Sequence, residues 1–316
     1  MKIVNIETDR RGEHEEKVFS ALGADYRCVN CGGDTGIIAR EAGDADVILF
    51  TASKVNKELI DSLPKARLFV RYGVGYDNVD LEYTKSRGVK VCNSPSYGSY
   101  DIAEHAFALL MAVNRKIAAY DRGIRAGTFG KSADYKCYRL EGKTLGLIGF
   151  GRIARRMLKF SSGFGMNVLV YDPYVGEDVI SLQEARKVGF EEVLIDSDYI
   201  SIHAPLNSET AGMFGTPEFE KMKDTAVIIN TARGGLIKTG DLIEALRSRT
   251  IRGAGIDVYD DYPRSADHPL ALLDNVVLTP HAAWNSVEAA YALHEEVADE
   301  VARFIRGEEL RNVVNK

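Results

Sequence analysis

The stretch Lys143–Asp172, KTLGLIGFGRIARRMLKFSSGFGMNVLVYD, decides the fold of this chain. It begins with an apolar run at 144–148, which is typical of a buried parallel strand. A glycine turn at 149–151 follows and leads into a segment with helical apolar spacing. A second apolar run, at 167–171, ends at Asp172. The order of strand, glycine turn, helix, strand and acid predicts a dinucleotide-binding unit.

Each position of this stretch has a physical role in such a unit. Gly149 permits a sharp turn, and Gly151 has no side chain, so a pyrophosphate can approach the backbone. The helix that begins there offers N–H groups and a partial positive charge to the anion. Ala154 is an accepted variant of the third glycine. Asp172 can accept hydrogen bonds from the adenosine ribose, which favours NAD over NADP. Such a turn can also serve helix–strand packing alone.

Composition limits the remaining possibilities. The chain has 316 residues, 45% of them hydrophobic and 27% charged, and a net charge of −6. These values are typical of an ordinary globular protein with room for two domains. No run of basic residues indicates a nucleic-acid partner, and no apolar stretch indicates a membrane span or a signal peptide. Four cysteines, with one isolated pair at Cys28 and Cys31, predict neither disulfides nor a metal site. We therefore expect a soluble, cytoplasmic protein.

Apolar runs alternate with amphipathic stretches along the chain, which predicts two doubly wound α/β domains. In the N-terminal part the predicted strands are 2–7, 46–53, 67–72 and 89–93, and the predicted helices are 13–22, 56–63 and 81–87. Residues 102–125 are predicted to form one long helix. Beyond the glycine unit, further strands are predicted at 199–203, 226–230, 253–257 and 276–278, and a closing helix at 286–306.

Polar residues follow several of these strands directly: Asp172, His203, Thr231 to Arg233, Asp257 and His281. Because ligands of open α/β sheets bind at the carboxyl ends of the strands, we expect these residues to share one edge.

Two of these residues can carry chemistry on a substrate. Arg233, on a glycine-lined turn, suits bidentate capture of a carboxylate, although an arginine can also be a solvated surface residue. His281, after a strand and a proline, suits proton transfer near neutral pH, although many single histidines are structural. His203, followed by Ala204-Pro205, is interpreted as a wall against the nicotinamide or ribose. His105 is interpreted as a core histidine.

A dinucleotide cradle, an anion clamp and a proton relay together suit hydride transfer with a small 2-oxo or 2-hydroxy acid. The chain also resembles the D-2-hydroxyacid dehydrogenases, a family that includes D-lactate, D-glycerate, phosphoglycerate and formate dehydrogenases. The resemblance covers nearly the whole chain. It is carried by RYGVGYDNVD at 71–80, GLIGFGRIA at 146–154, SIHAPLNSET at 201–210, INTARGG at 229–235, GIDVY at 255–259 and TPHAAW at 279–284.

The resemblance implies a domain plan and a set of site residues. A Rossmann NAD domain, 99–285, would be inserted into a flavodoxin-like substrate domain formed by 1–98 and 286–316, with catalysis in the cleft. Arg233 and His281 would be catalytic. The substrate would be bound by Val74, Gly75, Arg233 and Trp284. The cofactor would be bound by Gly149, Gly151, Arg152, Ile153, Asp172, His203, Pro205, Thr231, Ala232 and Asp257. The long helix from 102 would form a homodimer interface.

One position departs from the family pattern. The family usually has D-V-F-x-x-E-P, in which the glutamate bonds the catalytic histidine and keeps it protonated. This chain has Asp257-Val-Tyr-Asp-Asp-Tyr262-Pro, so a tyrosine stands in that place. Asp261, one residue earlier, is a second candidate partner of His281. We therefore predict a lower pKa for His281 than in its relatives.

Trp284 is a second unusual feature, and the HAAW sequence resembles the corepressor branch of the family, the C-terminal-binding proteins. An aromatic residue packed at the hinge and an aromatic wall of the substrate pocket are both open interpretations. The resemblance favours an NAD-dependent enzyme. The alternative interpretation is an NAD(H)-binding regulatory protein with little turnover, because Tyr262 replaces the usual glutamate partner of the histidine. The sequence identifies neither the particular hydroxy acid nor the physiological direction.

Overall fold

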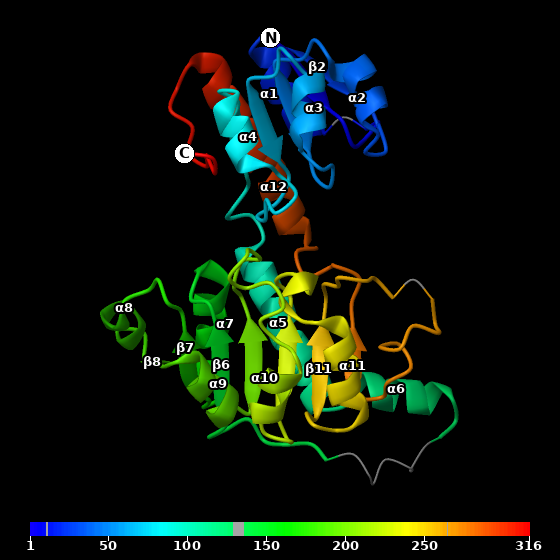
Figure 1. Ribbon diagram of the computed structural model, residues 1–316, viewed down its shortest axis with the longest axis vertical. Helices are drawn as coiled ribbons and strands as arrows, with labels where there is room; N and C mark the ends of the chain where they lie inside the picture. Colours follow the sequence, from blue (N-terminus) through cyan, green and yellow to red (C-terminus); the bar gives the residue numbers. More distant parts are fainter. Residues whose placement is uncertain (11, 129–135, 264) are drawn as a thin grey trace. The chain divides into compact units, whose positions relative to one another are not determined.

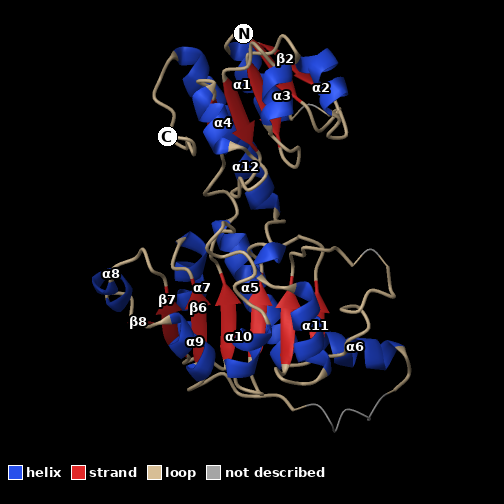
Figure 2. Ribbon diagram, in the orientation of Figure 1, coloured by secondary structure: helices blue, strands red, loops and turns tan. Residues whose placement is uncertain are grey.

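The chain divides into two compact units in the computed structural model, which describes residues 1–10, 12–128, 136–263 and 265–316. Unit 1 consists of Met1–Gly98 and Asn285–Lys316, and unit 2 is the continuous segment Ser99–Trp284. Each unit has one sheet, and the paired strands of each sheet run parallel to one another (Figures 1 and 2). The predicted fold class, two doubly wound α/β domains, is confirmed.

Unit 1 contains a five-stranded sheet in the order β2-β1-β3-β4-β5. The strands are β1 (Lys2–Asn5), β2 (Asp25–Cys28), β3 (Val47–Phe50), β4 (Leu68–Arg71) and β5 (Lys90–Cys92). The helices are α1 (Glu13–Ala21), α2 (Thr35–Ala42), α3 (Lys57–Ser62), α4 (Leu81–Ser86) and α12 (Val287–Arg306). The sequence patterns predicted these elements except β2 and α2. β2 is an edge strand with a single buried residue, Tyr26, so it lacks an apolar run.

Helices cover both faces of this sheet. α1 and α12 pack on one face, where Phe19 and Val297 join strand residues such as Leu49 in one apolar core. α2 and α3 supply Ile38 and Leu59 to a second core on the opposite face. The carboxyl ends of the strands are therefore the part of the sheet at which polar loops can meet a ligand.

Unit 2 contains a seven-stranded sheet in the order β12-β11-β10-β9-β6-β7-β8. The strands are β6 (Thr144–Ile148), β7 (Asn167–Tyr171), β8 (Arg186–Lys187), β9 (Tyr199–Ile202), β10 (Val227–Asn230), β11 (Gly253–Ile256) and β12 (Val276–Leu278). The helices are α5 (Ser99–Asn114), α6 (Ile117–Arg125), α7 (Arg152–Ser162), α8 (Glu177–Ser181), α9 (Phe190–Asp196), α10 (Thr216–Lys221) and α11 (Thr239–Arg247), with a 3-10 turn, η2 (Gly234–Leu236).

The sheet of unit 2 is also covered on both faces (Figure 1). α5 and α7 pack on one face, and α9, α10 and α11 pack on the other. Because both faces are buried, β9 and β10 are buried at every position, which is why they appear in the sequence as unbroken apolar runs. The strand order reverses between β6 and β9, and a crevice at this switch point is the usual ligand site of such sheets.

The prediction of one long helix over 102–125 is wrong. α5 ends at Asn114, and Lys116 adopts a left-handed backbone conformation with φ of 56° before α6 begins. Asn114 is fully buried, and its amide bonds the carbonyl of Tyr138 and the hydroxyl of Tyr199 at 2.8 Å each. These tertiary bonds hold the end of α5 in place, which an apolar pattern alone does not reveal. In the described ranges, no helix has both the length and the apolar character needed to cross a membrane.

Candidate active site

The turn after β6 can be formed only by glycine at its first position. Gly149 has φ of +88°, a region that side-chain-bearing residues rarely adopt. A Cβ atom at this residue would lie 2.9 Å from the backbone oxygen of His203, which follows β9. The turn is closed by the N–H of Gly149, which donates to Tyr171 O at 2.8 Å. Three neighbouring strand ends therefore meet at this turn.

Gly151 has a different environment. It begins α7 as its N-cap with φ of −77°, and no side chain caps the helix. A Cβ atom at this residue would meet no described atom within 4 Å, so the space over the turn is open. The first N–H groups of α7, at Arg152 and Ile153, carry the positive end of the helix dipole. An anionic group such as a pyrophosphate fits this open, uncapped turn.

Asp172 is fixed beside the glycine turn. Its Oδ2 accepts the N–H of Phe150 at 2.8 Å, and its Oδ1 accepts the N–H groups of Tyr174 at 2.9 Å and Val175 at 3.2 Å. The carboxylate is half-buried, so part of it remains accessible. Its position at the end of β7 suits hydrogen bonds from ribose hydroxyls, and its charge disfavours a 2′-phosphate.

His203 provides a neutral ring at the end of β9. Its N–H donates to Ile148 O at 2.7 Å, and its Nε2 lies 2.9 Å from the hydroxyl of Ser201. Burial lowers the pKa of His203 to about 3, so the ring carries no charge near neutral pH. A neutral ring suits the predicted wall role better than acid–base work. Pro205, which follows, is exposed.

The turn after β10 presents Thr231, Ala232 and Arg233. Asn230 shapes it: its Nδ2 donates to Arg233 O at 2.9 Å and its Oδ1 accepts the N–H of Ala232 at 3.0 Å. Thr231 is buried, and its Oγ1 has no hydrogen-bond partner within the described residues. An unsatisfied buried hydroxyl at a ligand edge indicates a missing polar partner, which a bound nucleotide can supply. The half-buried Arg233 donates from Nη1 to Ala232 O at 2.7 Å.

Asp257 anchors the loop that carries His281. The carboxylate is fully buried and accepts the Thr279 hydroxyl at 2.6 Å and the N–H groups of Ala282 and Ala283 at 2.9 and 3.0 Å. The backbone oxygen of Asp257 also accepts the N–H of His281 at 2.8 Å. Together these bonds hold His281 in a left-handed conformation with φ of 56°. Asp257 thus positions the histidine loop, a role that the sequence did not indicate.

The hydroxyl of Tyr262 contacts the ring of His281. It lies 2.9 Å from Nδ1, whereas the carboxylate of Asp261 lies 3.9 Å from Nε2 of His268. Burial and the charge of Asp257 raise the pKa of Tyr262, although Arg233 acts in the opposite direction. The hydroxyl therefore keeps its proton near neutral pH. Of the two partners that the sequence left open, the structure places Tyr262 against Nδ1.

The sequence did not connect two residues, Thr279 and His105, with this loop. Thr279 donates its only hydroxyl proton to Asp257, so it accepts from Nε2 of His105, which lies 2.9 Å away. His105 is on α5 and was predicted to be a core histidine. It is half-buried and not part of the core, and its hydrogen-bond partner belongs to the His281 loop. Because α5 and β12 are distant in sequence, no local pattern could have indicated this contact.

The predicted substrate residues Val74 and Gly75 lie in unit 1, after β4. The carbonyl of Val74 accepts Nδ2 of Asn93 at 2.6 Å, which fixes the loop from the β5 side. Within the described residues, the backbone N–H groups of Val74 and Gly75 donate no hydrogen bond. Two adjacent N–H groups of this kind can receive a carboxylate. Trp284, the last residue of unit 2, is half-buried.

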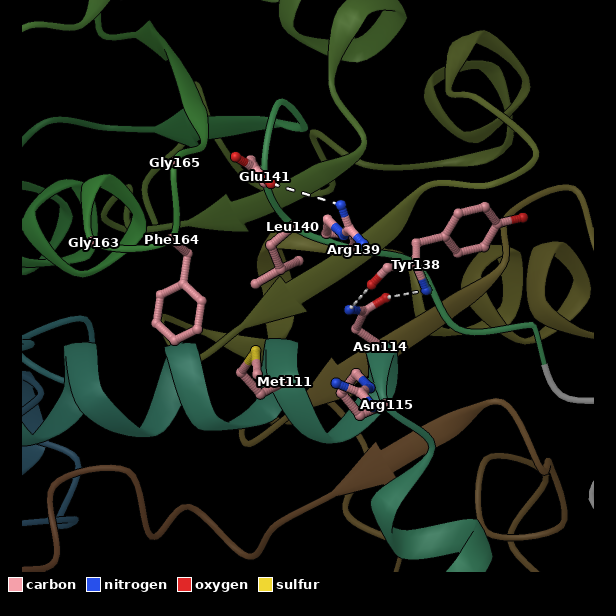
Figure 3. A pocket seen from close by; sticks show the side chains of 10 residues that line it. All are labelled: Met111, Asn114, Arg115, Tyr138, Arg139, Leu140, Glu141, Gly163, Phe164 and Gly165. Atoms are coloured by element: carbon pink, nitrogen blue, oxygen red, sulfur yellow. Dashed lines mark hydrogen bonds and ion pairs between the residues drawn. The ribbon is translucent and has the colours of Figure 1, made fainter.

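A separate hollow of about 450 Å³ lies at the amino-terminal edge of the unit 2 sheet (Figure 3). Its walls come from the end of α5, from residues 138–141 and from the turn 163–165. These segments precede β6 and β7, so the hollow lies away from the glycine turn that follows β6. It contains none of the predicted site residues.

Comparison with known proteins identifies the family. The model for the NAD binding domain of D-isomer specific 2-hydroxyacid dehydrogenases matches residues 107–283. A glyoxylate reductase of Thermococcus litoralis is 39% identical over 292 residues, which are 89% of this chain and 87% of the relative. The chain belongs to the D-isomer specific 2-hydroxyacid dehydrogenase family, and its second unit contains the NAD-binding domain.

Other relatives extend the comparison. A D-3-phosphoglycerate dehydrogenase of Archaeoglobus fulgidus is 37% identical across 85% of this chain, but the match spans only 51% of that protein. A D-lactate dehydrogenase from Aquifex aeolicus, solved with NAD and lactic acid, is 27% identical with a TM-score of 0.88, and 99% of each chain is covered. An acyclic imino acid reductase solved with NADPH and D-Arg has 29% identity and a TM-score of 0.90, with 99% of this chain and 100% of that chain covered.

The two glycines of the turn should respond differently to alanine. We expect Gly149→Ala to lower the free energy of unfolding by about 2 kcal/mol, because the added methyl group meets a backbone oxygen at positive φ. Gly151→Ala should leave stability nearly unchanged but weaken NADH binding about tenfold or more, because its methyl group fills the open space. Urea unfolding and calorimetric titration separate the two effects. Equal loss of stability in both variants would contradict this assignment.

Proposed function

We propose that the protein is an NAD-dependent oxidoreductase that interconverts a D-2-hydroxy acid and its 2-oxo acid. The observation that carries the proposal is the edge of the unit 2 sheet, where the open glycine turn, Arg233 and the His281–Tyr262 pair follow strands of one sheet. The family match supports the same reaction class. A nucleotide cradle, a cation for a carboxylate and a proton-transfer group are what this reaction requires.

Each residue has a role in the proposed reaction. When bound, the reduced nicotinamide supplies a hydride to the carbonyl carbon of the substrate. Arg233 holds the substrate carboxylate by a charge-assisted, bidentate contact. His281 delivers a proton to the carbonyl oxygen from Nε2, since Nδ1 is engaged by the hydroxyl of Tyr262. In the reverse direction His281 accepts this proton.

Tyr262 makes the proton relay of this chain different from a carboxylate–histidine pair. The hydroxyl can accept a hydrogen bond from the N–H group at Nδ1. This bond fixes the orientation of the ring and its tautomer. The hydroxyl carries no negative charge, so it stabilises the imidazolium form less than a carboxylate does. We infer that Tyr262 keeps the ring of His281 in the orientation needed for proton transfer. It stabilises the protonated form of His281 less than a glutamate would.

A regulatory role without turnover was the alternative suggested by the missing glutamate. The contact between Tyr262 and His281 supplies the ring with a hydrogen-bonding partner, and no observation favours that alternative. We therefore retain only the enzyme. The N–H groups of Val74 and Gly75 are proposed to receive the substrate carboxylate, and Trp284 is proposed to contact the rest of the substrate.

We propose small 2-oxo acids as substrates. The glyoxylate reductase of Thermococcus litoralis and a hydroxypyruvate reductase of Blautia hydrogenotrophica, 33% identical over 87% of this chain and 86% of that relative, are named for acids of two and three carbons. The four cysteines, of which Cys137 is exposed, form no disulfide in the part of the chain that the structure describes, which supports a reducing, cytoplasmic location.

We also propose a homodimer that uses α6. This helix is amphipathic, yet none of its residues is buried, and Ile117 and Ile124 are 55% and 57% exposed. An apolar helix face left uncovered within a chain is typical of an interface. α5 supplies the adjoining surface, while most of its apolar residues pack against the sheet.

The function is tested by NADH oxidation with glyoxylate, pyruvate, hydroxypyruvate and phenylpyruvate. We expect turnover with at least one of these acids. Arg233→Ala should lower kcat/KM about a thousandfold, because the substrate carboxylate loses a bidentate, charge-assisted partner. Arg247→Ala, which changes an exposed arginine of the same unit, serves as the matched control and should be silent. Absence of turnover with every acid, despite NADH binding, would overturn the proposal.

The pH dependence of reduction tests the role of Tyr262. In Tyr262→Glu the carboxylate should raise the pKa of His281, so reduction should persist to a pH about one unit higher than in the wild type. Reduction requires protonated His281, so its rate is lost as pH rises through that pKa. Tyr262→Phe, which removes the hydroxyl alone, should show no upward shift. A pH–rate profile identical in wild type and Tyr262→Glu would refute this role.

The oligomeric state tests the α6 interface. Light scattering should give twice the chain mass for the wild type and the monomer mass for the double variant Ile117→Glu, Ile124→Glu, because burying two charges in an apolar interface is unfavourable. Leu182→Glu changes a still more exposed apolar residue outside α6, and this variant should remain dimeric. A dimer that survives the double substitution would exclude α6 from the interface.

A further inference from the structure

Glu7 has no role in the predictions from the sequence. Its carboxylate holds one of the loops at the carboxyl ends of the unit 1 strands. Glu7 follows β1, and its carboxylate accepts the N–H of Ala52 at 2.8 Å from both oxygens and the N–H of Ser53 at 2.5 Å. Ala52 and Ser53 lie in the loop after β3, the strand between β1 and β4. The charge of Glu7 therefore ties the ends of two adjacent strands together.

Glu7 is ionised when it makes these bonds. Burial acts to raise its pKa, but the hydrogen bonds from Ala52, Ser53 and Thr51 outweigh burial and hold the pKa below its usual value. Charge-assisted bonds to backbone N–H groups are stronger than neutral ones. The loop after β3 therefore has a firm anchor although Thr51 and Ala52 are exposed.

The anchored loop is bonded in turn to the segment that carries Val74 and Gly75. Nδ2 of Asn78 donates to Ser53 O at 2.8 Å and to Thr51 O at 3.3 Å. The N–H of Val55 donates to Asn78 O at 2.9 Å, and the two segments form a short parallel bridge between Val55 and Val79. A continuous set of hydrogen bonds thus connects Glu7 with the far end of the 74–78 loop.

The near end of the same loop is held separately. The carbonyl of Val74 accepts Nδ2 of Asn93, and the carbonyl of Gly73 accepts the N–H of Ser94 at 3.0 Å. These bonds come from the segment after β5. The 73–78 loop is therefore fixed from both sides, with Glu7 supplying the charged anchor on the side of β1 and β3.

We propose that Glu7 is a positioning residue for substrate binding, which acts through the loop after β3 and Asn78 to hold the Val74 and Gly75 N–H groups. The inference rests on the proposed function because it takes these two N–H groups as receptors of the substrate carboxylate. Glu7 itself is not placed in contact with the substrate. The carboxylate that the loop receives does not change during the reaction, so its binding contributes equally to the ground state and the transition state.

The kinetic signature of this role is an increase in KM without a matching loss of kcat. We expect Glu7→Ala to raise KM for the best 2-oxo acid about tenfold and to change kcat less than about threefold. Glu7→Gln retains one acceptor oxygen and should raise KM less. The affinity for NADH should not change, because the glycine turn lies in unit 2.

Asp46→Asn is the matched control. Asp46 also accepts a backbone N–H, from Lys2 at 2.8 Å, but it lies at the amino-terminal edge of the same sheet. It should leave KM unchanged. An equal increase in KM for Asp46→Asn and Glu7→Gln, or an unchanged KM in both Glu7 variants with a native circular dichroism spectrum, overturns the proposal.

Amide hydrogen exchange measures the same link without turnover. In Glu7→Gln, exchange should accelerate at 51–55 and at 74–78 but not at 2–5 or 90–92. Acceleration confined to 51–55 would show that the anchor does not reach Val74 and Gly75, and would overturn the proposal whatever the substrate. Inactivity of the wild type with every 2-oxo acid, by contrast, would count against the proposed function, and this exchange pattern would still decide the role of Glu7.

Discussion

The close approach of two backbones at Gly149 is the constraint on which the site in unit 2 depends. A Cβ atom at Gly149 would lie only 2.9 Å from the carbonyl oxygen of His203, so β6 and β9 can end side by side only if the turn has no side chain. This contact sets the start of α7, where Gly151 leaves the first N–H groups open to an anion. It also places Asp172 and His203 on either side of β6, since β7 and β9 are its neighbours.

The buried charge of Asp257 plays the corresponding role on the other side of the sheet. Removing a carboxylate from water is unfavourable unless its oxygens are satisfied, and here Thr279, Ala282 and Ala283 satisfy them. The same bonds determine the path of the loop and hold the backbone of His281 in a left-handed conformation. The histidine is thus positioned through its backbone by Asp257 and through its ring by Tyr262. The 73–78 loop of unit 1, which we propose binds the substrate, follows the same principle, with Glu7 as its charged anchor.

The sequence was sufficient for features that depend on periodicity and local turns. The apolar runs located β6 and β7 to the residue, and the family resemblance collected the candidate site residues. The sequence was insufficient for features that are determined by hydrogen bonds between distant parts of the chain. The break after Asn114 depends on Tyr138 and Tyr199, and the roles of Thr279, His105 and Glu7 depend on contacts between elements far apart in the chain. The choice between Asp261 and Tyr262 likewise needed the path of the backbone, because the two residues are adjacent in sequence.

The most direct test of this account is the crystal structure of the protein with NADH. We expect the pyrophosphate to lie over Gly151, within hydrogen-bonding distance of the N–H groups of Arg152 and Ile153, and a carboxylate oxygen of Asp172 to accept the adenosine ribose hydroxyls. A complex in which the pyrophosphate contacts side chains alone, or in which the nucleotide occupies another part of the molecule, would contradict the central claim.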